Sequence, residues 1–473
     1  MSEDKNKATS KSWKVKALER NKELHKRNKR IKELSKSRDL WKHKYQALRS
    51  EVGYGSLSLR GSKAKHHSYS TLLVWFCVQA QSYGQMSLRG CVQVLLCLEL
   101  VSGRLGGKGV PSYGSIRNWV CKAGYYRIHH EDNSSEDRWV YVVDESISLG
   151  KERILLVLGI RLRDLNFIDC VDLASTQVLS LEVASSWKST DIAPILKGLT
   201  QRYPLAYIVS DEGNNLRKAY KLMGGLHIPD CSHFFAKTIE RLYRSDPIFV
   251  DFSKQSSAIN KKWNLSQYAP YMSPRQRSKA RFANLFPVIE WAYECLQQWD
   301  CLPDEVQIQL SFLKKYQSWI DEFYRIQQEV AYLSSLLKRK GFGQDNYRRI
   351  QERLSVTQGA KEKIFAEKIL EYLSKLADIK IENVETLYCC SDIIESAFGK
   401  FKQKINPKST HAVSEFVLIL ASFGKTYQEE EIKQALEKVS EKQVKGWRKK
   451  APSIAQQRRK IFGKNEGKKL PDS

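Results

Sequence analysis

The sequence predicts an α/β protein, in which a mixed sheet with helices on its faces is preceded by a helical region and interrupted by an all-helical insertion. Three observations predict this class. Period-two alternation of apolar residues begins near residue 139 and gives three consecutive strands. Two helical segments then alternate with two short apolar strands. The rest of the chain has helical spacing almost throughout.

Residues 1–50 predict a long basic helix, because they contain 17 Lys or Arg against 6 Asp or Glu and no proline or glycine. A loose apolar stripe runs through Leu24, Ile31, Leu34, Trp41, Tyr45 and Leu48. Arg27 and Arg38 interrupt this stripe, so two interpretations remain open. The helix is either a solvated arm that touches DNA or keeps the protein soluble, or a self-association helix. Residues 51–69, rich in glycine, serine and basic residues, predict a linker.

Residues 70–130 predict a helical region with the layout of a helix-turn-helix. Two apolar helices are followed by the turn GRLGGKGVPSY and a third helix, for which Ser112 or Ser115 is the expected N-cap. The expected inner face of the third helix carries Ile116, Trp119 and Val120. In a DNA-binding helix-turn-helix, the residues facing the major groove would be Arg117, Asn118 and Lys122. The alternative interpretation is an ordinary small helical bundle.

Residues 135–235 predict the sheet. Its first two strands are WVYVVDESISL and RILLVLGIRLR, its third is either LNFIDCVDLAS or VLSLEVASSW, and the three pair as an antiparallel meander. An amphipathic helix, TDIAPILKGLTQRYP, follows with Thr190 or Asp191 as its cap. The strand LAYIVSDEGNN, the helix LRKAYKLMG and the short strand HIPDCSH complete this part.

The remaining segments predict helices and a basic tail. Residues 236–387 read as an all-helical insertion, because no strand-like alternation is convincing there. Residues 388–435 are expected to return to the sheet as C-terminal helices. Residues 436–473 are dense in Lys and Arg, and we expect them to lack structure until they meet a polyanion.

Charge narrows the class of partner. The 473-residue chain has a formal net charge of +27 and a pI near 9.5, which favours a polyanion, either nucleic acid or an acidic membrane surface. No window approaches the roughly 18 to 20 apolar residues that span a bilayer, and the N-terminus is polar where a secretory signal is apolar. We therefore expect a soluble intracellular protein that binds nucleic acid. The ten cysteines form no C-x-x-C pair and are expected to be reduced core thiols.

Two aspartates predict a metal site at one edge of the sheet. Asp144 lies in the middle of the first strand, where an unpaired buried carboxylate would cost several kcal/mol. Asp211 ends the fourth strand, although it could merely open a turn. If the two strands are neighbours, both carboxylates reach the same ion, and hard oxygen donors suit Mg²⁺. The competing acids are Asp169, Asp172, Glu145 and Glu212. The pleat of a strand disfavours the two glutamates, because it turns each adjacent residue toward the opposite face.

A third acid lies in the stretch YCCSDIIESAFGKFKQK, from Tyr388 to Lys404. Ser391 is the expected N-cap of a helix, and Glu395 falls one turn into it. Glu395 would complete a site for two metal ions about 4 Å apart. Lys402 follows two turns later on nearly the same face, where it would contact DNA phosphate. The alternative is that Glu395 only interacts favourably with the helix dipole.

These residues resemble the DDE transposases of bacterial insertion sequences, a group with an RNase H-like catalytic core. The resemblance covers roughly residues 139–235 and 385–405, and several of these families also carry a helical insertion before the glutamate. The three acids of the motif match Asp144, Asp211 and Glu395.

Two shorter motifs extend the resemblance. Some of these families carry a tyrosine seven residues before the glutamate, an arginine four before it and a lysine seven after it. Tyr388 and Lys402 match, whereas Ser391 stands in place of the arginine. Many also have a Cys or Asp, two residues and then a His after the second aspartate, and Asp230 to His233 is similar. The alternative for His233 is a hydrogen-bonded histidine at a strand end.

The resemblance implies a two-step phosphoryl transfer on DNA. The three acids would hold two Mg²⁺ ions, for which Mn²⁺ can substitute. Water would nick the element end, and the freed 3′ hydroxyl would then attack target DNA. Lys400 would join Lys402 on DNA, and the auxiliary residues would be Asn214, His233 and Tyr388. The implied partners are the terminal repeats, target DNA and further copies of the chain, in the cytoplasm at the nucleoid. The alternatives are another RNase H-like metal nuclease and a catalytically inactive DNA-binding regulator.

Overall fold

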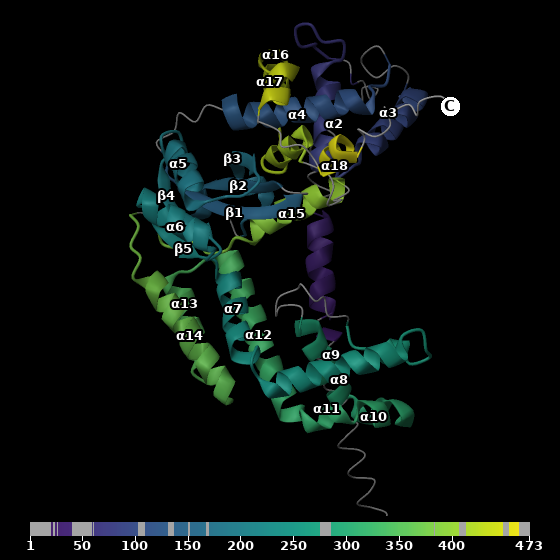
Figure 1. Ribbon diagram of the computed structural model, residues 1–473, viewed down its shortest axis with the longest axis vertical. Helices are drawn as coiled ribbons and strands as arrows, with labels where there is room; N and C mark the ends of the chain where they lie inside the picture. The colour runs from purple at the N-terminus through teal and green to yellow at the C-terminus, as the bar shows by residue number, and fades with distance from the viewer. Residues whose placement is uncertain are drawn as a thin grey trace, which may run out of the picture.

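The computed structural model describes residues 20–21, 24–25, 27–39, 59, 61–102, 109–130, 137–149, 152–166, 170–274, 285–382, 384–405, 413–447 and 454–462. These residues form an α/β protein with one five-stranded mixed sheet, which confirms the predicted class (Figure 1). The strands are β1 (Trp139–Leu149), β2 (Glu152–Arg161), β3 (Gln177–Ala184), β4 (Leu205–Ser210) and β5 (His227–Pro229).

The strand order in the sheet is β3-β2-β1-β4-β5. The first three strands form the predicted antiparallel meander, whereas β4 pairs with β1 in parallel and β5 pairs with β4 in parallel. The third strand is the second of the two segments that the sequence offered. The first segment instead begins in the last residues of a 3-10 helix, η1 (Leu162–Asn166), and ends in another, η2 (Leu173–Ser175). Asp172 caps η2 by accepting a hydrogen bond from the Ser175 N–H at 2.9 Å, which favours a turn over a strand.

Two helices cover one face of the sheet. They are α5 (Ser189–Thr200) and α6 (Asn214–Met223), which pack on Tyr141 and Val143 of β1. The predicted cap of α5 was wrong by two to three residues, because Lys188 occupies the N-cap position. The helix begins at Ser189, and the Asp191 carboxylate accepts a hydrogen bond from the Lys188 N–H at 3.1 Å.

The opposite face of β1 is covered by the C-terminal part of the chain. Val140 and Val142 point to this face and belong to the same apolar core as Phe398 and Leu418. The covering elements are α15 (Asp392–Lys404) and η6 (Glu415–Ser422). Because side chains alternate along a strand, Asp144 faces the side that α15 crosses, and Glu145 faces α5 and α6.

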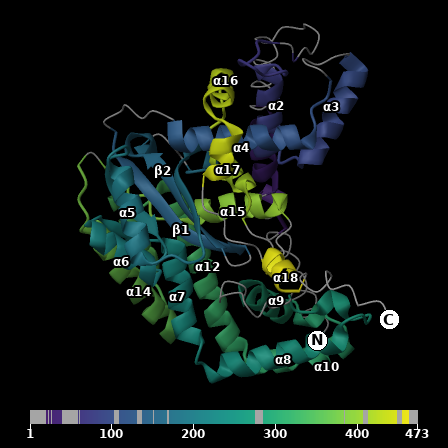
Figure 2. The same ribbon diagram turned by 45° about the horizontal axis from the view of Figure 1, so that its top comes forward.

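A helical layer lies beyond the elements that cover this face of the sheet (Figures 1 and 2). Its elements are α2 (Thr71–Ser82), α3 (Leu88–Ser102), α4 (Tyr113–His130), α16 (Glu429–Lys438) and α17 (Glu441–Gly446). The predicted inner face of α4 is confirmed, since Ile116, Trp119 and Val120 are buried. The Ser112 hydroxyl accepts a hydrogen bond from the Ser115 N–H at 3.2 Å, so Ser112 is the capping residue of the two that were expected.

Arg127 of α4 joins this layer to the C-terminal part. Its side chain is 5% exposed, and its guanidinium donates two hydrogen bonds to the Glu431 carboxylate, at 2.6 and 3.0 Å. It also donates to the backbone carbonyls of Ala421, Lys425 and Thr426, and it stacks 3.5 Å from the ring centroid of Tyr427. The guanidinium therefore satisfies its donors within one buried network.

The insertion extends away from the sheet as helices only. Between Pro247 and Ala377 the described residues form no β-strand. Figures 1 and 2 both show α7 and α12 running outward and α8, α9 and α10 at the far end, and Figure 1 shows α11 there too. The elements are α7 (Cys231–Tyr243), α8 (Pro247–Trp263), η3 (Ala269–Tyr271), α9 (Phe286–Gln297), η5 (Trp299–Cys301), α10 (Asp304–Leu310), α11 (Phe312–Lys315), α12 (Gln317–Lys340), α13 (Gln344–Leu354) and α14 (Ala360–Ala377).

Three predictions concern the ends of the chain. The described residues of segment 1–50 are helical, and Leu24, Ile31 and Leu34 are exposed, which leaves both interpretations of that helix open. The described part of the predicted linker is packed, since the Lys65 N–H donates to the Glu437 carboxylate at 3.0 Å. The other apolar residues of the N-terminal stripe, Trp41, Tyr45 and Leu48, lie outside the described residues.

The predicted lack of structure in residues 436–473 is wrong for α17, and it is also wrong for α18 (Ile454–Phe462). This segment is rich in Ala, Gln, Arg and Lys, which are good helix formers. In the part of the chain that the structure describes, no helix is both long enough and apolar enough to cross a membrane.

Candidate metal and nucleic-acid site

The three predicted acids meet at one edge of the sheet. Val143 of β1 pairs with Ser210 of β4. Asp144 and Asp211 are the next residues of the two paired segments, so they lie side by side at the same edge of the sheet. Glu395 lies in the first turn of α15, which packs against β1. The proximity of the other two acids affects the pKa of the Asp144 carboxyl. Its pKa is raised from 3.8 to about 7, first by burial and then by the charges of Asp211 and Glu395.

In the described part of the chain, the one ion-pair partner of the three acids is His233, whose Nε2 lies 4.0 Å from Glu395 Oε1. Among the described residues, no donor forms a hydrogen bond to the Asp144 carboxylate, and the Asp211 carboxylate accepts one, from the Gly213 N–H at 2.9 Å. The Glu395 side chain is 63% exposed. His233 opposes the rise of the Asp144 pKa but does not cancel it. Uncompensated carboxylates at a sheet edge are hard oxygen donors, and they fit Mg²⁺ or Mn²⁺.

The spacing of these acids is wider than that of a closed single-ion site. One group of three potential ligands in the described residues has its ligand atoms within 4.8 Å of one another, and it consists of Asp230, Cys231 and Cys390. Mutual repulsion keeps like charges apart when no cation lies between them. A site for two ions also requires a wider spread of ligands than a site for one.

His233 is held in place by a buried aspartate. Asp230 is 1% exposed, and its Oδ2 accepts hydrogen bonds from His233 Nδ1 at 2.5 Å and from the Ser391 hydroxyl at 2.8 Å. Its Oδ1 accepts from the Ser232 N–H at 3.0 Å, which caps α7. The other ring nitrogen, His233 Nε2, lies 4.0 Å from Glu395 Oε1. Asp230 therefore fixes the ring orientation beside the acids.

The hydrogen bond that the Asp230 carboxylate accepts from His233 is the largest cause of the raised His233 pKa, and burial opposes it. We expect Asp230→Asn to lower the His233 pKa, as measured by NMR titration of the imidazole protons. A raised histidine pKa stabilises the fold below the ordinary value of 6.5, and this contribution is lost as pH rises through the folded-state pKa. The variant should therefore lose more stability at pH 5.5 than at pH 9. An unchanged His233 titration would contradict the assigned hydrogen bond.

Ser391 has a different role from the one expected. It occupies the N-cap position of α15, but its hydroxyl makes no capping hydrogen bond. The hydroxyl donates instead to Asp230, so Ser391 supports the aspartate that holds His233. Asp392, in the first turn of α15, forms an ion pair with Lys338 at the end of α12. The insertion thus contacts the helix that carries Glu395.

The other predicted residues near the site are placed as follows. Lys402 is exposed on α15 and Lys400 is half-buried. Asn214 is exposed at the first residue of α6. Tyr388 is 5% exposed, and its N–H donates to the Tyr207 hydroxyl at 2.9 Å. The Tyr388 side chain therefore belongs to the core and does not line the site as an auxiliary group.

The competing acids have other surroundings. Glu145 faces α6, where burial is the first cause of its raised pKa and the charge of Arg153 opposes that rise. Glu212 forms an ion pair with Lys237 at 3.3 Å. Asp172 caps η2, and Asp169 lies outside the described residues. The pleat argument against Glu145 is thus consistent with the structure.

The predicted recognition face of α4 is occupied by contacts within the chain. Arg117 forms an ion pair with Glu415 at 3.3 Å, and the Asn118 amide donates to Glu441 at 3.3 Å. Burial lowers the pKa of the half-buried Lys122, and Glu441 opposes this shift. In this structure α4 is the centre of a helical layer, and it does not present these side chains as a free reading helix for the major groove.

Two features near the site were missed by sequence reasoning. One is the role of Asp230 as the common acceptor of His233 and Ser391. The other is the convergence of Cys231 and Cys390 from two distant segments. The neighbouring contact between Ser232 and Cys390 joins residues that are 158 positions apart in the chain. The adjacent cysteines at 389 and 390, directly before α15, were the available signal.

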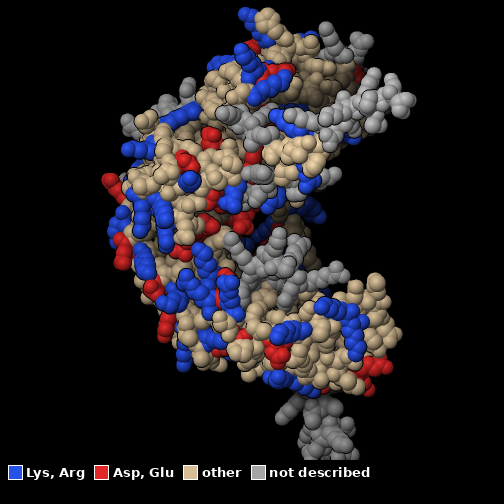
Figure 3. Space-filling model, in the orientation of Figure 1, with Lys and Arg blue, Asp and Glu red and all other residues tan. Residues whose placement is uncertain are grey.

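The surroundings of the site combine a hollow with mixed charge. Figure 3 shows this face hollowed between the sheet with its helical layer and the far end of the insertion. Acidic side chains gather on the wall of the hollow, where α15 crosses β1, and basic side chains lie over α6 and along α7 and α12.

In comparisons with known proteins, no protein-family model matches the chain and no curated protein is significantly similar in sequence.

Proposed function

We propose that this protein is a DNA transposase of the DDE type, with an RNase H-like core, that cleaves the ends of an insertion sequence and joins them to target DNA. One observation carries the proposal. The carboxylates of Asp144, Asp211 and Glu395 come from three distant segments and approach closely enough to help raise the pKa of Asp144. Such an acidic cluster beside a hollow suits a polyphosphate substrate only when divalent cations are present.

The sheet topology supports the same proposal. Three antiparallel strands precede two strands that are parallel to the first, and the order is β3-β2-β1-β4-β5. An RNase H-like core is expected to have this order and to place its first two acids on adjacent central strands. The helix that carries the third acid crosses the sheet beside them.

In this proposal each residue near the site has a defined task. Asp144, Asp211 and Glu395 hold two Mg²⁺ ions, for which Mn²⁺ can substitute. When bound, the ions activate the attacking oxygen and stabilise the leaving oxygen. His233, oriented by Asp230, fixes the position of the Glu395 carboxylate. Lys402 and Lys400 neutralise phosphate along α15, while exposed Asn214 contacts the DNA beside Asp211.

The partners follow from the reaction. The substrate is DNA, both the terminal repeats and the target, and the net charge of +27 supports binding to it. We further propose that the protein acts at the nucleoid as a homo-oligomer, because two element ends must be held at once.

The proposal is tested with the DNA that flanks the gene. Purified protein, Mg²⁺ and labelled duplexes carrying each flank should give nicks at the element ends. Duplexes with pre-cut 3′ ends should then be joined to a plasmid target, which separates a transposase from another RNase H-like nuclease. Cleavage without joining would replace the transposase by the nuclease, and Mg²⁺-independent cleavage would remove the acids from the mechanism.

Lys402 gives a prediction for DNA binding. Replacing it with Ala should weaken binding to all sequences about equally and reduce the dependence of log affinity on log salt concentration by about one. Fluorescence anisotropy at several salt concentrations measures both quantities. Lys363→Ala, which removes an exposed lysine from α14, is the matched control and should leave the slope unchanged. An equal effect of both substitutions would show that α15 is not the contact.

A further inference from the structure

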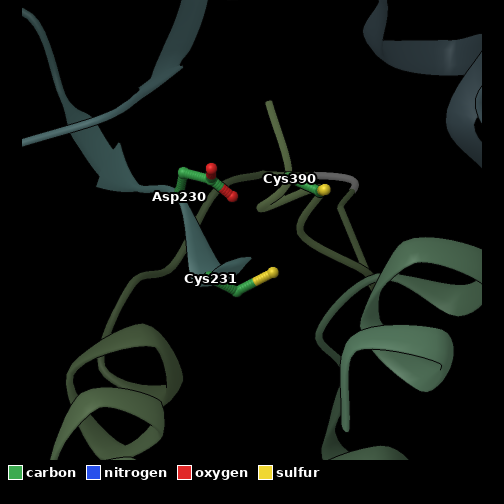
Figure 4. A group of neighbouring side chains, drawn as sticks. All are labelled: Asp230, Cys231 and Cys390. Atoms are coloured by element: carbon green, nitrogen blue, oxygen red, sulfur yellow. The ribbon is translucent and has the colours of Figure 1, made fainter. Parts of the chain in front are cut away.

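A group of buried sulfur and oxygen atoms lies behind the acidic site. One carboxylate oxygen of Asp230 and the Sγ atoms of Cys231 and Cys390 all lie within 4.8 Å of one another. Figure 4 shows the two thiols and the carboxylate converging from the junction of β5 with α7 and from the segment before α15. The three side chains are at most 2% exposed.

A third thiol adjoins this group. Cys389 is fully buried, its thiol contributes most to raising the pKa of the Cys231 thiol, and its carbonyl accepts from the Cys231 N–H at 2.9 Å. Thiols are weak hydrogen-bonding groups, so three of them beside one carboxylate gain little from each other in a dry core. Packing alone would be served as well by alanine or valine.

The donor set matches the preferences of one class of metal. Tetrahedral zinc sites take thiolates at about 2.3 Å, which places neighbouring sulfur atoms about 3.8 Å apart. The ligand atoms of Asp230, Cys231 and Cys390 already lie within 4.8 Å of one another. Three sulfurs and one oxygen are also too soft a set for Mg²⁺, which distinguishes this group from the acids at the sheet edge.

Positive charge is available to balance thiolates. The ammonium of Lys338 forms an ion pair with Asp392. It also lies close enough to Cys390 and Cys231 for both to contribute to its raised pKa. His233 hydrogen-bonds to Asp230 from the other side. A carboxylate offers about four lone-pair sites, so Asp230 can keep these hydrogen bonds and still bind an ion.

We propose that Asp230, Cys231 and Cys390, completed by Cys389, bind one zinc ion as a structural site. Each thiol that binds releases its proton to solvent, and the ion then joins the start of α7 to the segment that leads into α15. These two elements carry His233 and Glu395, so the zinc would fix their relative positions. The inference does not rest on the proposed function, since it concerns metal content and needs no DNA.

The test is metal analysis of the full-length protein, purified under reducing conditions from zinc-supplemented medium. We expect about one zinc per chain after dialysis, and a sulfur-to-metal charge-transfer absorption after replacement by Co²⁺. Cys231→Ser and Cys390→Ser should each reduce retained zinc at least tenfold. The matched control is Cys295→Ser, which alters a buried thiol of α9 outside the group and should retain the wild-type amount.

Two results would overturn the proposal. The first is wild-type protein without retained zinc and without the cobalt charge-transfer band, a measurement that does not depend on whether any variant folds. The second is full zinc retention by a folded Cys231→Ser, Cys390→Ser double variant. DNA cleavage can fail while zinc is retained, or persist without it, so the outcome is separable from that of the transposase test.

Discussion

Replacing Asp144 with Asn is expected to reduce Mg²⁺-dependent DNA cleavage by at least about 10³-fold while leaving DNA affinity nearly unchanged. The carboxylate lies on the central strand, and Asn removes its charge with almost no change in shape. DNA affinity depends on phosphate contacts made elsewhere on a strongly basic chain. A gel-based cleavage assay and fluorescence anisotropy on the same duplex measure the two quantities.

Glu145→Gln is the matched control. It removes the same charge one residue further along β1, but Glu145 faces α6 on the other side of the sheet. We expect this variant to keep most of its cleavage activity. Equal loss from both substitutions would show that charge near the strand matters and that Asp144 has no special position. Full cleavage by Asp144→Asn would exclude Asp144 as a metal ligand. If this variant loses DNA cleavage but keeps the biological effect of the protein, a DNA-binding regulator is favoured.

The same substitution should stabilise the protein in the absence of divalent cations. The Asp144 carboxyl has a pKa of about 7 in the folded chain against an ordinary 3.8, because burial and neighbouring acids disfavour its charge. Stability therefore falls as pH rises from about 4 to 7, where the unfolded chain releases this proton more readily. At pH 8 with EDTA, we expect Asp144→Asn to gain about 1–3 kcal/mol, allowing for solvent screening. At pH 4 the gain should vanish, and thermal unfolding at both pH values measures it.

Arg127→Met is expected to destabilise the protein by about 3–5 kcal/mol. The substitution leaves the Glu431 carboxylate and the carbonyls of Ala421, Lys425 and Thr426 without their donor in a buried setting. Methionine fills much of the same volume, so the loss reports the polar network and not a cavity. Urea unfolding followed by tryptophan fluorescence is a suitable measurement, because Trp75 and Trp119 lie in this layer.

Arg117→Met provides the comparison on the same helix. Arg117 is 33% exposed and forms one ion pair, with Glu415. Partly exposed pairs contribute about 0–1 kcal/mol, so this variant should be close to wild type in stability. A similar destabilisation by both variants would contradict the description of Arg127 as the anchor of the layer. If Arg117→Met instead weakens DNA binding strongly, the original expectation of a reading helix regains support.

The sheet was predictable because its information is local. Alternation of apolar residues marked β1 and β2, and short apolar runs marked β4 and β5. The position of Asp144 in a strand interior explained why it stood out among 52 acidic residues. The choice of β3 could not be made, since both candidate segments contain β-branched and apolar residues. The turn chemistry of Asp172 and Ser175 decides it, and that hydrogen bond is visible only in the structure.

The parts that depend on distant contacts were not predictable. The polar face of α4 has the composition of a DNA-reading helix, and only the approach of Glu415 and Glu441 shows where those side chains are directed. Cys231 and Cys390 form no short motif, so their convergence depends on the path of the whole insertion. Ser391 was expected to cap α15, but a buried aspartate competes successfully for its hydroxyl.

The Arg127 network also has a consequence for synthesis. Its two ends, on α4 and α16, are 304 residues apart in the chain. A ribosome therefore exposes α4 long before the helix that completes its layer has been translated, and the third acid of the sheet edge also emerges late. A nascent or truncated chain would carry apolar helices without their cover and two acids without the third. Full assembly of this layer becomes possible only after Glu431 of α16 has been translated.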